Sequence, residues 1–416
     1  MDMKPVRGKN ASAATGARGL PQATLGTSAS AGTAPRAFAL WQLGFRPFYL
    51  LASGFAALSI ALWAAQYAGW LRASYLPGPL WHAHEMLYGY TLAVITGFLF
   101  TAVRNWTNRA TPTGGWLMAV AALWVAGRIL IFTPYAWLSA VANAAFPLAV
   151  AAGIGIPLFQ SRNRRNYFFV ALLIVIALAV LYVHLTQLLG WSMPAWVGIQ
   201  VALDVVLFVM SVMGGRVIPM FTANAIAQAK SRRHPAVERI SLGAVLLLLL
   251  VDALQIKGAW LVAVLVVAAL SHLLRWWLWA PYKTYRNPLV WVLHAAYVWI
   301  PIHLALRIAA ELQLIAAPLA AHALTVGAIG VLTIGMMTRT TKGHTGRPLV
   351  ADAGDVACYS LVLAAAVVRV FGPMLLPELY VGCVLVSAAC WSAGFGLFAI
   401  RYWSPLTRAR PDGKPG

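Results

Sequence analysis

The sequence predicts an all-α fold, a polytopic membrane helical bundle of about 12 transmembrane helices with the N and C termini cytoplasmic. Two observations predict the membrane bundle. Of the 416 residues, 61% are hydrophobic and only 10% are charged, whereas a soluble domain is about half apolar and a quarter charged. Apolar runs also recur along almost the whole chain, from Phe48 to Tyr402, with the basic residues placed between them. This pattern indicates one membrane-embedded domain.

The chain divides into a membrane domain and a tail at each end. Residues 1–38 are rich in Ala, Gly, Ser and Thr and contain no apolar segment of signal-peptide length, so we expect a disordered cytoplasmic tail. Residues 39–403 are predicted to form a single transmembrane helical domain. Residues 404–416 are predicted to form a cytoplasmic C-terminal tail.

Twelve helices follow from the lengths of the apolar runs. A helix needs about 20 apolar residues to cross a bilayer, and charged, Pro-rich or Gly-rich turns separate the runs. The predicted helices span residues 46–66, 82–102, 116–133, 137–158, 167–189, 197–213, 238–255, 259–279, 289–310, 317–339, 355–375 and 379–401.

The distribution of basic residues predicts the orientation of these helices. With a cytoplasmic N-terminus, only five of the 31 Lys and Arg lie on or near the outer face. These five are Arg72, Arg128, Lys257, Arg307 and Arg369. Cytoplasmic loops of membrane proteins carry an excess of Lys and Arg. The net charge of +21 therefore indicates membrane topology rather than binding to nucleic acid.

Histidines inside the predicted helices are the main functional signal, because ionisable side chains in a membrane are costly and usually functional. At about 1.5 Å rise per residue, His184, His303 and His322 lie at one depth on the outer side, and His82 and His84 open the second helix nearby. Imidazole ligates haem iron and copper, and helical bundles build such sites from facing helices. We predict that these five histidines hold metal.

Other arrangements of the histidines stay open. His82 and His84 lie about 200° apart on an ideal helix, so both can bind one metal only where the helix start is unwound. Every histidine can instead form a hydrogen bond between helices without any cofactor. His272 and His294 share a depth on the inner side, and with His344 in an inner loop they are candidates for a second metal or haem site.

Charged residues are candidate partners for such sites. Glu85 and Asp204 lie near the outer histidines and can orient an imidazole or accept a proton. Arginines can pair with these acids or with haem propionates, with snorkelling to the interface as the alternative. The candidate arginines are Arg46, Arg128, Arg216, Arg307, Arg339 and Arg369.

Several long, ordered motifs resemble the NnrS family, over about residues 40 to 400. They are Leu43-Gly44-Phe45-Arg46-Pro47-Phe48, Trp81-His82-Ala83-His84-Glu85-Met86, and the stretches at 97–103, 215–224, 322–330 and 336–348. The resemblance implies a bacterial inner-membrane protein that contains haem and copper and is associated with denitrification, nitric oxide and nitrosative stress. Haem-copper oxidases are comparable by analogy only, since Asp204 stands where a histidine is wanted.

Three functions compete. The first is a haem and copper protein that binds, senses or detoxifies nitric oxide or a related small ligand. The second is a twelve-helix transporter of a small solute or metal ion, because Pro219, Gly327 and Gly330 permit broken helices. The third is a nitric oxide reductase-like enzyme. The sequence has no CxxCH motif and no cluster-type cysteine spacing, so an enzyme of this kind needs an external electron donor.

Overall fold

Apolar helices with short connections make up the described chain. The computed structural model describes residues 38–67, 69–71 and 75–412. Within these ranges every regular element is a helix, apart from an isolated β-bridge between Phe38 and Arg408. The predicted N-terminal tail lies outside the described residues except for Phe38. The all-α prediction is confirmed.

The described residues form fifteen α-helices, with short π- and 3-10 helical segments between some of them. The α-helices are α1 (Phe45–Tyr67), α2 (Gly78–His84), α3 (Leu92–Thr107), α4 (Gly114–Leu130), α5 (Ala136–Gln160), α6 (Phe168–Leu188), α7 (Trp196–Ala225), α8 (Pro235–Ala253), α9 (Ala259–Leu278), α10 (Pro288–Tyr297), α11 (Trp299–Glu311), α12 (Ala317–His322), α13 (Val331–His344), α14 (Ala353–Leu375) and α15 (Tyr380–Thr407). The π-helices are η1 (Glu85–Thr91) and η5 (Ala323–Gly330), and the 3-10 helices are η2 (Arg164–Asn166), η3 (Ala227–Ala229), η4 (Pro281–Lys283) and η6 (Pro377–Leu379).

Ten helical segments of the described residues are long and apolar enough to cross a membrane. Three of them contain two α-helices each. The segment Gly78–Thr107 contains α2, η1 and α3, Pro288–Glu311 contains α10 and α11, and Ala317–His344 contains α12, η5 and α13. Helix α4 is apolar but has only 17 residues. The chain is therefore a multi-pass membrane protein.

The structure differs from the sequence prediction at α7. The predicted helix ends near residue 213, before Gly214, Gly215 and Pro219, whereas α7 continues through all three to Ala225. Proline and glycine are tolerated in membrane helices where neighbouring helices satisfy and cover the backbone. Here a Cβ on Gly214 would come within 3.1 Å of the Tyr297 ring. The glycine thus permits close helix packing rather than ending the helix.

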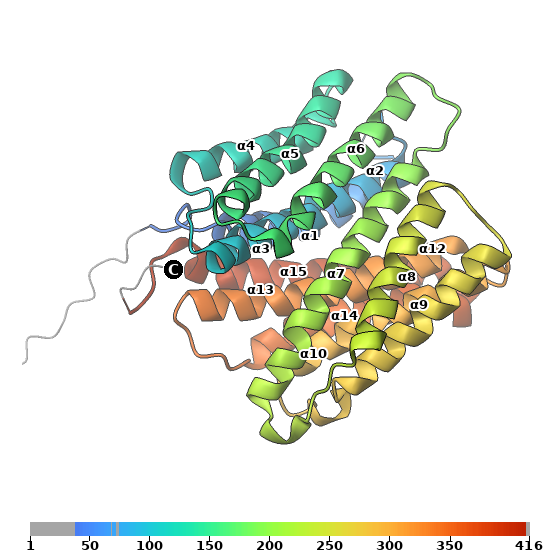
Figure 1. Ribbon diagram of the computed structural model, residues 1–416. Helices are drawn as coiled ribbons and strands as arrows, with labels where there is room; N and C mark the ends of the chain where they lie inside the picture. Colours follow the sequence, from blue (N-terminus) through green and yellow to red (C-terminus); the bar gives the residue numbers. More distant parts are fainter. Residues whose placement is uncertain (1–37, 68, 72–74, 413–416) are drawn as a thin grey trace, which may run out of the picture. The chain divides into compact units, whose positions relative to one another are not determined.

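Helices that follow one another in sequence pack side by side, as α5 with α6, α8 with α9, and α14 with α15 (Figure 1). The first and last long helices, α1 and α15, also pack together. Their ends are tied by the Ala39 amide, which donates to the Thr407 carbonyl oxygen at 2.7 Å. Helix α15 runs to Thr407, past residue 403, where the C-terminal tail is predicted to begin.

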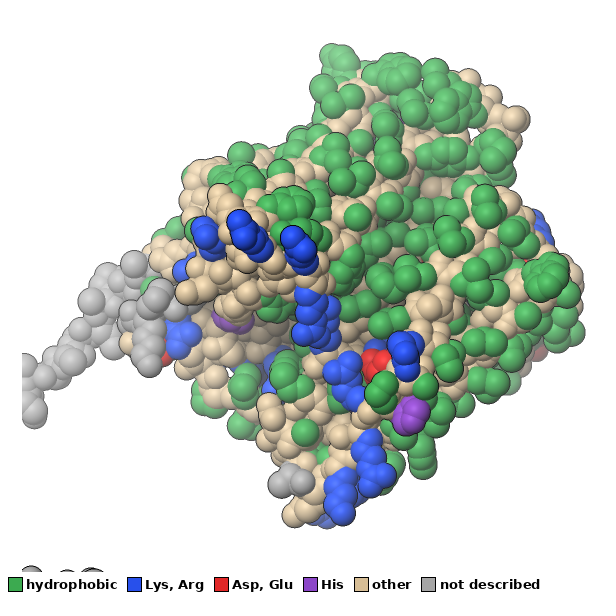
Figure 2. All heavy atoms as spheres, in the orientation of Figure 1, with side chains coloured by type: hydrophobic (Ala, Val, Ile, Leu, Met, Phe, Trp, Pro, Cys, Tyr) green, Lys and Arg blue, Asp and Glu red, His purple; other side chains and the backbone are tan. Residues whose placement is uncertain are grey.

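The surface separates apolar from basic side chains. Figure 2 shows hydrophobic side chains over most of the visible face and Lys and Arg gathered in a band along one side. Basic residues from different parts of the chain also lie close together, since Arg165 and Arg233 both repel the charge of Arg216. One basic edge beside a broad apolar surface suits a protein whose helices cross a bilayer.

Candidate metal-binding histidines

Three of the five histidines predicted on the outer side, which we call the outer histidines, lie at or near a point where α-helix changes to π-helix. Helix α2 has a proline in its first turn, where proline favours the start of a helix. It carries His82 and ends at His84, and η1 begins with the next residue. Helix α12 likewise ends at His322 and is followed directly by η5. Single π-helical stretches within α-helices are rare and frequently occur at functional sites.

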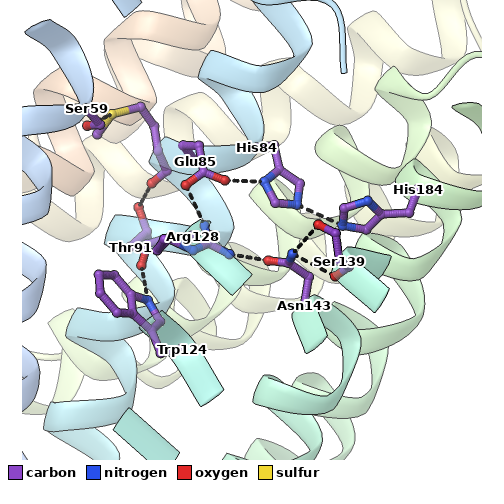
Figure 3. A network of polar contacts seen from close by, with 11 residues as sticks. Ser59, His84, Glu85, Thr91, Trp124, Arg128, Ser139, Asn143 and His184 are labelled. Atoms are coloured by element: carbon purple, nitrogen blue, oxygen red, sulfur yellow. Dashed lines mark hydrogen bonds and ion pairs between the residues drawn. The ribbon is translucent and has the colours of Figure 1, made fainter. Parts of the chain in front are cut away.

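His84 of α2 and His184 of α6 point toward each other (Figure 3). Their Nε2 atoms are 3.2 Å apart, and both side chains have 0% exposure. His84 Nδ1 lies 2.8 Å from Glu85 Oε1, and His184 Nδ1 lies 2.6 Å from the Tyr75 hydroxyl. Partners of this kind fix the tautomer and ring orientation of metal-binding histidines. The pair therefore presents two oriented Nε2 atoms to one buried point.

Glu85 belongs to a buried polar network behind this pair (Figure 3). Its Oε2 accepts a hydrogen bond from Arg128 Nη1 at 2.8 Å. The Arg128 guanidinium also donates to Asn143 Oδ1, and Asn143 Nδ2 donates to the Ser139 carbonyl oxygen at 2.9 Å. The Arg128 charge balances the Glu85 carboxylate, which would be very costly to bury alone. The network thus fixes the position of the Glu85 carboxylate, which in turn orients the His84 ring.

His82 faces a different histidine. Its ring centroid is 6.4 Å from that of His322, with 15° between the ring planes. Two imidazoles that bind one metal from opposite sides have a centroid separation on the order of 6 Å, because each metal–nitrogen bond is about 2 Å. Trp63 stacks on His82 at 5.3 Å. The second outer pair is therefore His82 with His322.

Arg369 lies beside this second pair, close enough to His82 and His322 for its charge to act on both rings. Within the described ranges, its buried Nη1 has no hydrogen-bond partner. A buried guanidinium nitrogen without an acceptor is costly. Arg369 therefore has a donor to offer to an anionic group next to the two histidines.

His303 of α11 stands apart from both pairs. Its Nδ1 donates to the Ala320 carbonyl oxygen of α12 at 2.7 Å. Its buried Nε2 lacks a hydrogen-bond partner among the described residues. The five predicted outer histidines thus occur as two facing pairs and one separate imidazole with an open nitrogen.

Asp204 does not join the outer histidines. It lies in a separate group with Gln200, Asp252 and Arg307. Asp204 was predicted to orient an outer histidine, but in the structure its carboxylate contacts these three residues instead. Depth along a helix placed Asp204 near the histidines, but α7 turns its carboxylate toward α8 and α11.

The inner histidines have separate environments. His272 Nδ1 lies 2.7 Å from the Tyr297 hydroxyl, and His294 Nε2 lies 2.8 Å from Thr222 Oγ1. The remaining ring nitrogen of each is buried and, in the described part of the chain, has no partner. His344 lies against the Phe45 ring, with centroids 5.6 Å apart. These contacts join each inner histidine to its own neighbour.

Three candidate arginines contact groups other than the outer histidines. Arg46 donates to the Leu406 and Arg408 carbonyl oxygens at 3.0 and 2.9 Å. Arg216 donates to Asn166 Oδ1 at 2.8 Å. Arg339 lies over the Phe221 ring, with its Cζ 3.7 Å from the centroid. Their contacts fasten helix ends to neighbouring helices.

The chemistry of the donors can be compared with the metals that the sequence predicts. Among the described residues, no group of three or more His, Cys, Asp or Glu side chains is arranged to hold a metal ion. Haem iron needs only one or two protein ligands, because the porphyrin supplies four, and imidazole suits both iron and copper. A pair of imidazoles therefore has the number of protein ligands that haem iron takes, and provides two of the donors for copper.

Sequence reasoning did not single out Tyr75, Asn143 or Trp63. Asn143 had a detectable signal, since it is a polar residue in the middle of the apolar helix α5. Tyr75 lies in the connection before α2 and Trp63 in α1, and aromatic residues near membrane interfaces are common. Only the tertiary structure brings these two rings against histidines.

A family model described as NnrS protein matches residues 39–410, a range that contains every helix from α1 to α15. No curated protein matches the chain.

Proposed function

Because the chain belongs to the NnrS family, we propose that it is a haem- and copper-containing protein of the bacterial inner membrane, which acts in the response to nitric oxide and nitrosative stress during denitrification. Family membership supports the link to nitric oxide. The observation that carries the metal proposal is the buried pair His84 and His184, with Nε2 atoms 3.2 Å apart. The proposed activity is binding, sensing or detoxification of nitric oxide.

In this proposal each of the two outer histidine pairs binds a different metal. His82 and His322 hold haem iron, and the free Nη1 of Arg369 binds a haem propionate. His84 and His184 hold copper, and His303, which stands apart with an open Nε2, is a separate candidate ligand. When bound, copper would offer nitric oxide a vacant coordination position, and haem iron would bind it in exchange for one of its two histidine ligands.

The protein residues around the copper pair orient and insulate it. Glu85 and Tyr75 hold the outer nitrogens of His84 and His184, which directs both Nε2 atoms inward. Both rings are buried, so water is kept away from the donors. A dry site strengthens the electrostatic effect of every nearby charge, and the charge of Arg128 reaches this pair through its ion pair with Glu85.

The metal proposal is tested on purified protein from cells supplied with haem and copper. We expect a Soret band, bound copper, and a shift of the Soret band when nitric oxide is added under anaerobic conditions. The variant His234→Ala serves as a control, because His234 is exposed before α8 and should leave all three signals unchanged. Preparations with neither a Soret band nor copper would refute the proposal.

We also propose twelve crossings with both termini in the cytoplasm. The ten long apolar segments and the two shorter helices α4 and α8 together make twelve crossings. The alternation of basic and nearly uncharged loops supports this count. Reporter fusions test it: a fusion after Gly190 or Gly258 should report the outer side, and a fusion after Arg233 the cytoplasm. A cytoplasmic signal after Gly258 would remove α8 from the set of crossings.

A further inference from the structure

A second buried group of charges lies at the outer ends of α7, α8 and α11. Arg307 of α11 donates to both carboxylate oxygens of Asp252 of α8, each at 2.8 Å. It also lies 3.8 Å from Asp204 Oδ1 of α7. Gln200, one turn before Asp204, donates to Asp204 Oδ1 at 3.0 Å and reaches Asp252 Oδ2 at 3.4 Å. Four side chains from three helices thus converge.

One carboxylate oxygen of Asp204, Oδ2, has no hydrogen-bond donor among the described residues. The residue has 0% exposure. The Asp252 carboxylate is within hydrogen-bonding reach of Asp204, but two ionised carboxylates have no hydrogen to share. A buried acceptor without a partner, next to a like charge, is doubly unfavourable. A proton on Asp204 turns this repulsion into a hydrogen bond to Asp252.

The charges of the neighbouring residues lead to the same conclusion. Two carboxylates face one guanidinium, which leaves one negative charge uncompensated when both are ionised. Glu311, further along α11, adds negative potential at Arg307. His303, one turn before Arg307, is near enough to Asp252 to feel its charge but donates its Nδ1–H to Ala320. One bound proton neutralises the buried group.

We propose that Asp204 and Asp252 form a proton-binding site that holds one proton at neutral pH, with Arg307 as the fixed counter-charge. Asp204 carries the proton and donates it to Asp252, whose oxygens accept from Arg307. A metal cation is a poor occupant, because it would lie against the guanidinium that already binds both Asp252 oxygens. Asp252 precedes the last residue of α8 and Arg307 lies one turn before the end of α11, so the proton exchanges with the outer side.

Infrared spectroscopy of the purified, full-length protein tests this proposal. We expect a carbonyl band of a protonated carboxylic acid at neutral pH, shifted in D2O and shifted again when aspartate is labelled with ¹³C at its side-chain carboxyl group. Aspartate labelling separates Asp204 from the buried Glu85. The band should be lost in Asp204→Asn and unchanged in Asp352→Asn, since Asp352 is an exposed residue paired with Arg401.

Thermal unfolding gives an independent readout. Asparagine resembles protonated aspartate in shape and charge, so Asp204→Asn should keep the melting temperature of the wild type, whereas Asp252→Asn should lower it because Arg307 loses its bidentate partner. Absence of a labelled aspartic acid band in the wild type would overturn the proposal, even if Asp204→Asn does not accumulate. Persistence of the band in Asp204→Asn would overturn it too.

Discussion

Replacing His184 by alanine is expected to reduce the copper content of the purified protein to background while the haem spectrum remains. His84 and His184 offer two buried Nε2 atoms to one point, and a single imidazole cannot hold copper against competing ligands in the cell. His82 and His322 face each other elsewhere, so the proposed haem pair is untouched. Metal analysis by mass spectrometry, together with the Soret absorbance, measures both contents in one preparation.

Three further variants make this prediction specific. His322→Ala should show the reverse pattern, with haem lost and copper kept. Tyr75→Phe removes only the hydroxyl next to His184 and should weaken copper binding by about 10- to 100-fold, the usual effect of losing a partner of a metal-binding histidine. A His184→Ala protein with wild-type copper content would contradict the assignment of copper to this pair.

Replacing Arg128 by methionine is expected to lower the free energy of unfolding by about 3–5 kcal/mol, because it leaves a buried carboxylate without its counter-charge. Arg128 and Glu85 are both buried, with Nη1 and Oε2 2.8 Å apart. Asn143 would also lose the donor to its Oδ1. Unfolding of the purified protein in detergent, followed by circular dichroism against denaturant, measures the change.

A double variant isolates the cause. In Arg128→Met with Glu85→Gln the buried charge is absent, so most of the lost stability should return. Arg109→Met is the matched control, since Arg109 is exposed at the end of α3 and should change stability very little. If the double variant were as unstable as Arg128→Met alone, the loss of packing around Arg128 would be the cause and the ion-pair argument would fail.

Most of the fold was accessible from the sequence because membrane crossing is a local requirement. A run of about 20 apolar residues must form a helix in a bilayer, and the predicted helices at 137–158 and 259–279 correspond closely to α5 and α9. The predicted end of this helix near residue 213 was wrong, because glycine and proline residues such as Gly214, Gly215 and Pro219 usually break helices in water. In the bundle, Tyr297 covers Gly214, and Arg275 and Glu238 lie against Gly215.

The histidine sites were only partly accessible. Counting residues from the turns placed His184, His303 and His322 at one depth, and the 200° angle between His82 and His84 indicated that these two face different directions. Depth does not say which helices are neighbours or how each is rotated. The structure therefore joined His84 to His184 and His82 to His322, and it moved Asp204 into a group with Asp252 and Arg307.

The sequence by itself determined the class of protein, the approximate helix ranges and the family motifs, because hydropathy, charge and motif order are properties of short segments. The tertiary structure decided the π-helices after His84 and His322, the two histidine pairs and the carboxylate pair of Asp204 and Asp252. These features depend on the rotation and packing of helices that are distant in sequence. A rotation of one residue turns a helical side chain by about 100°, which is enough to move a ligand from the bundle interior to the lipid.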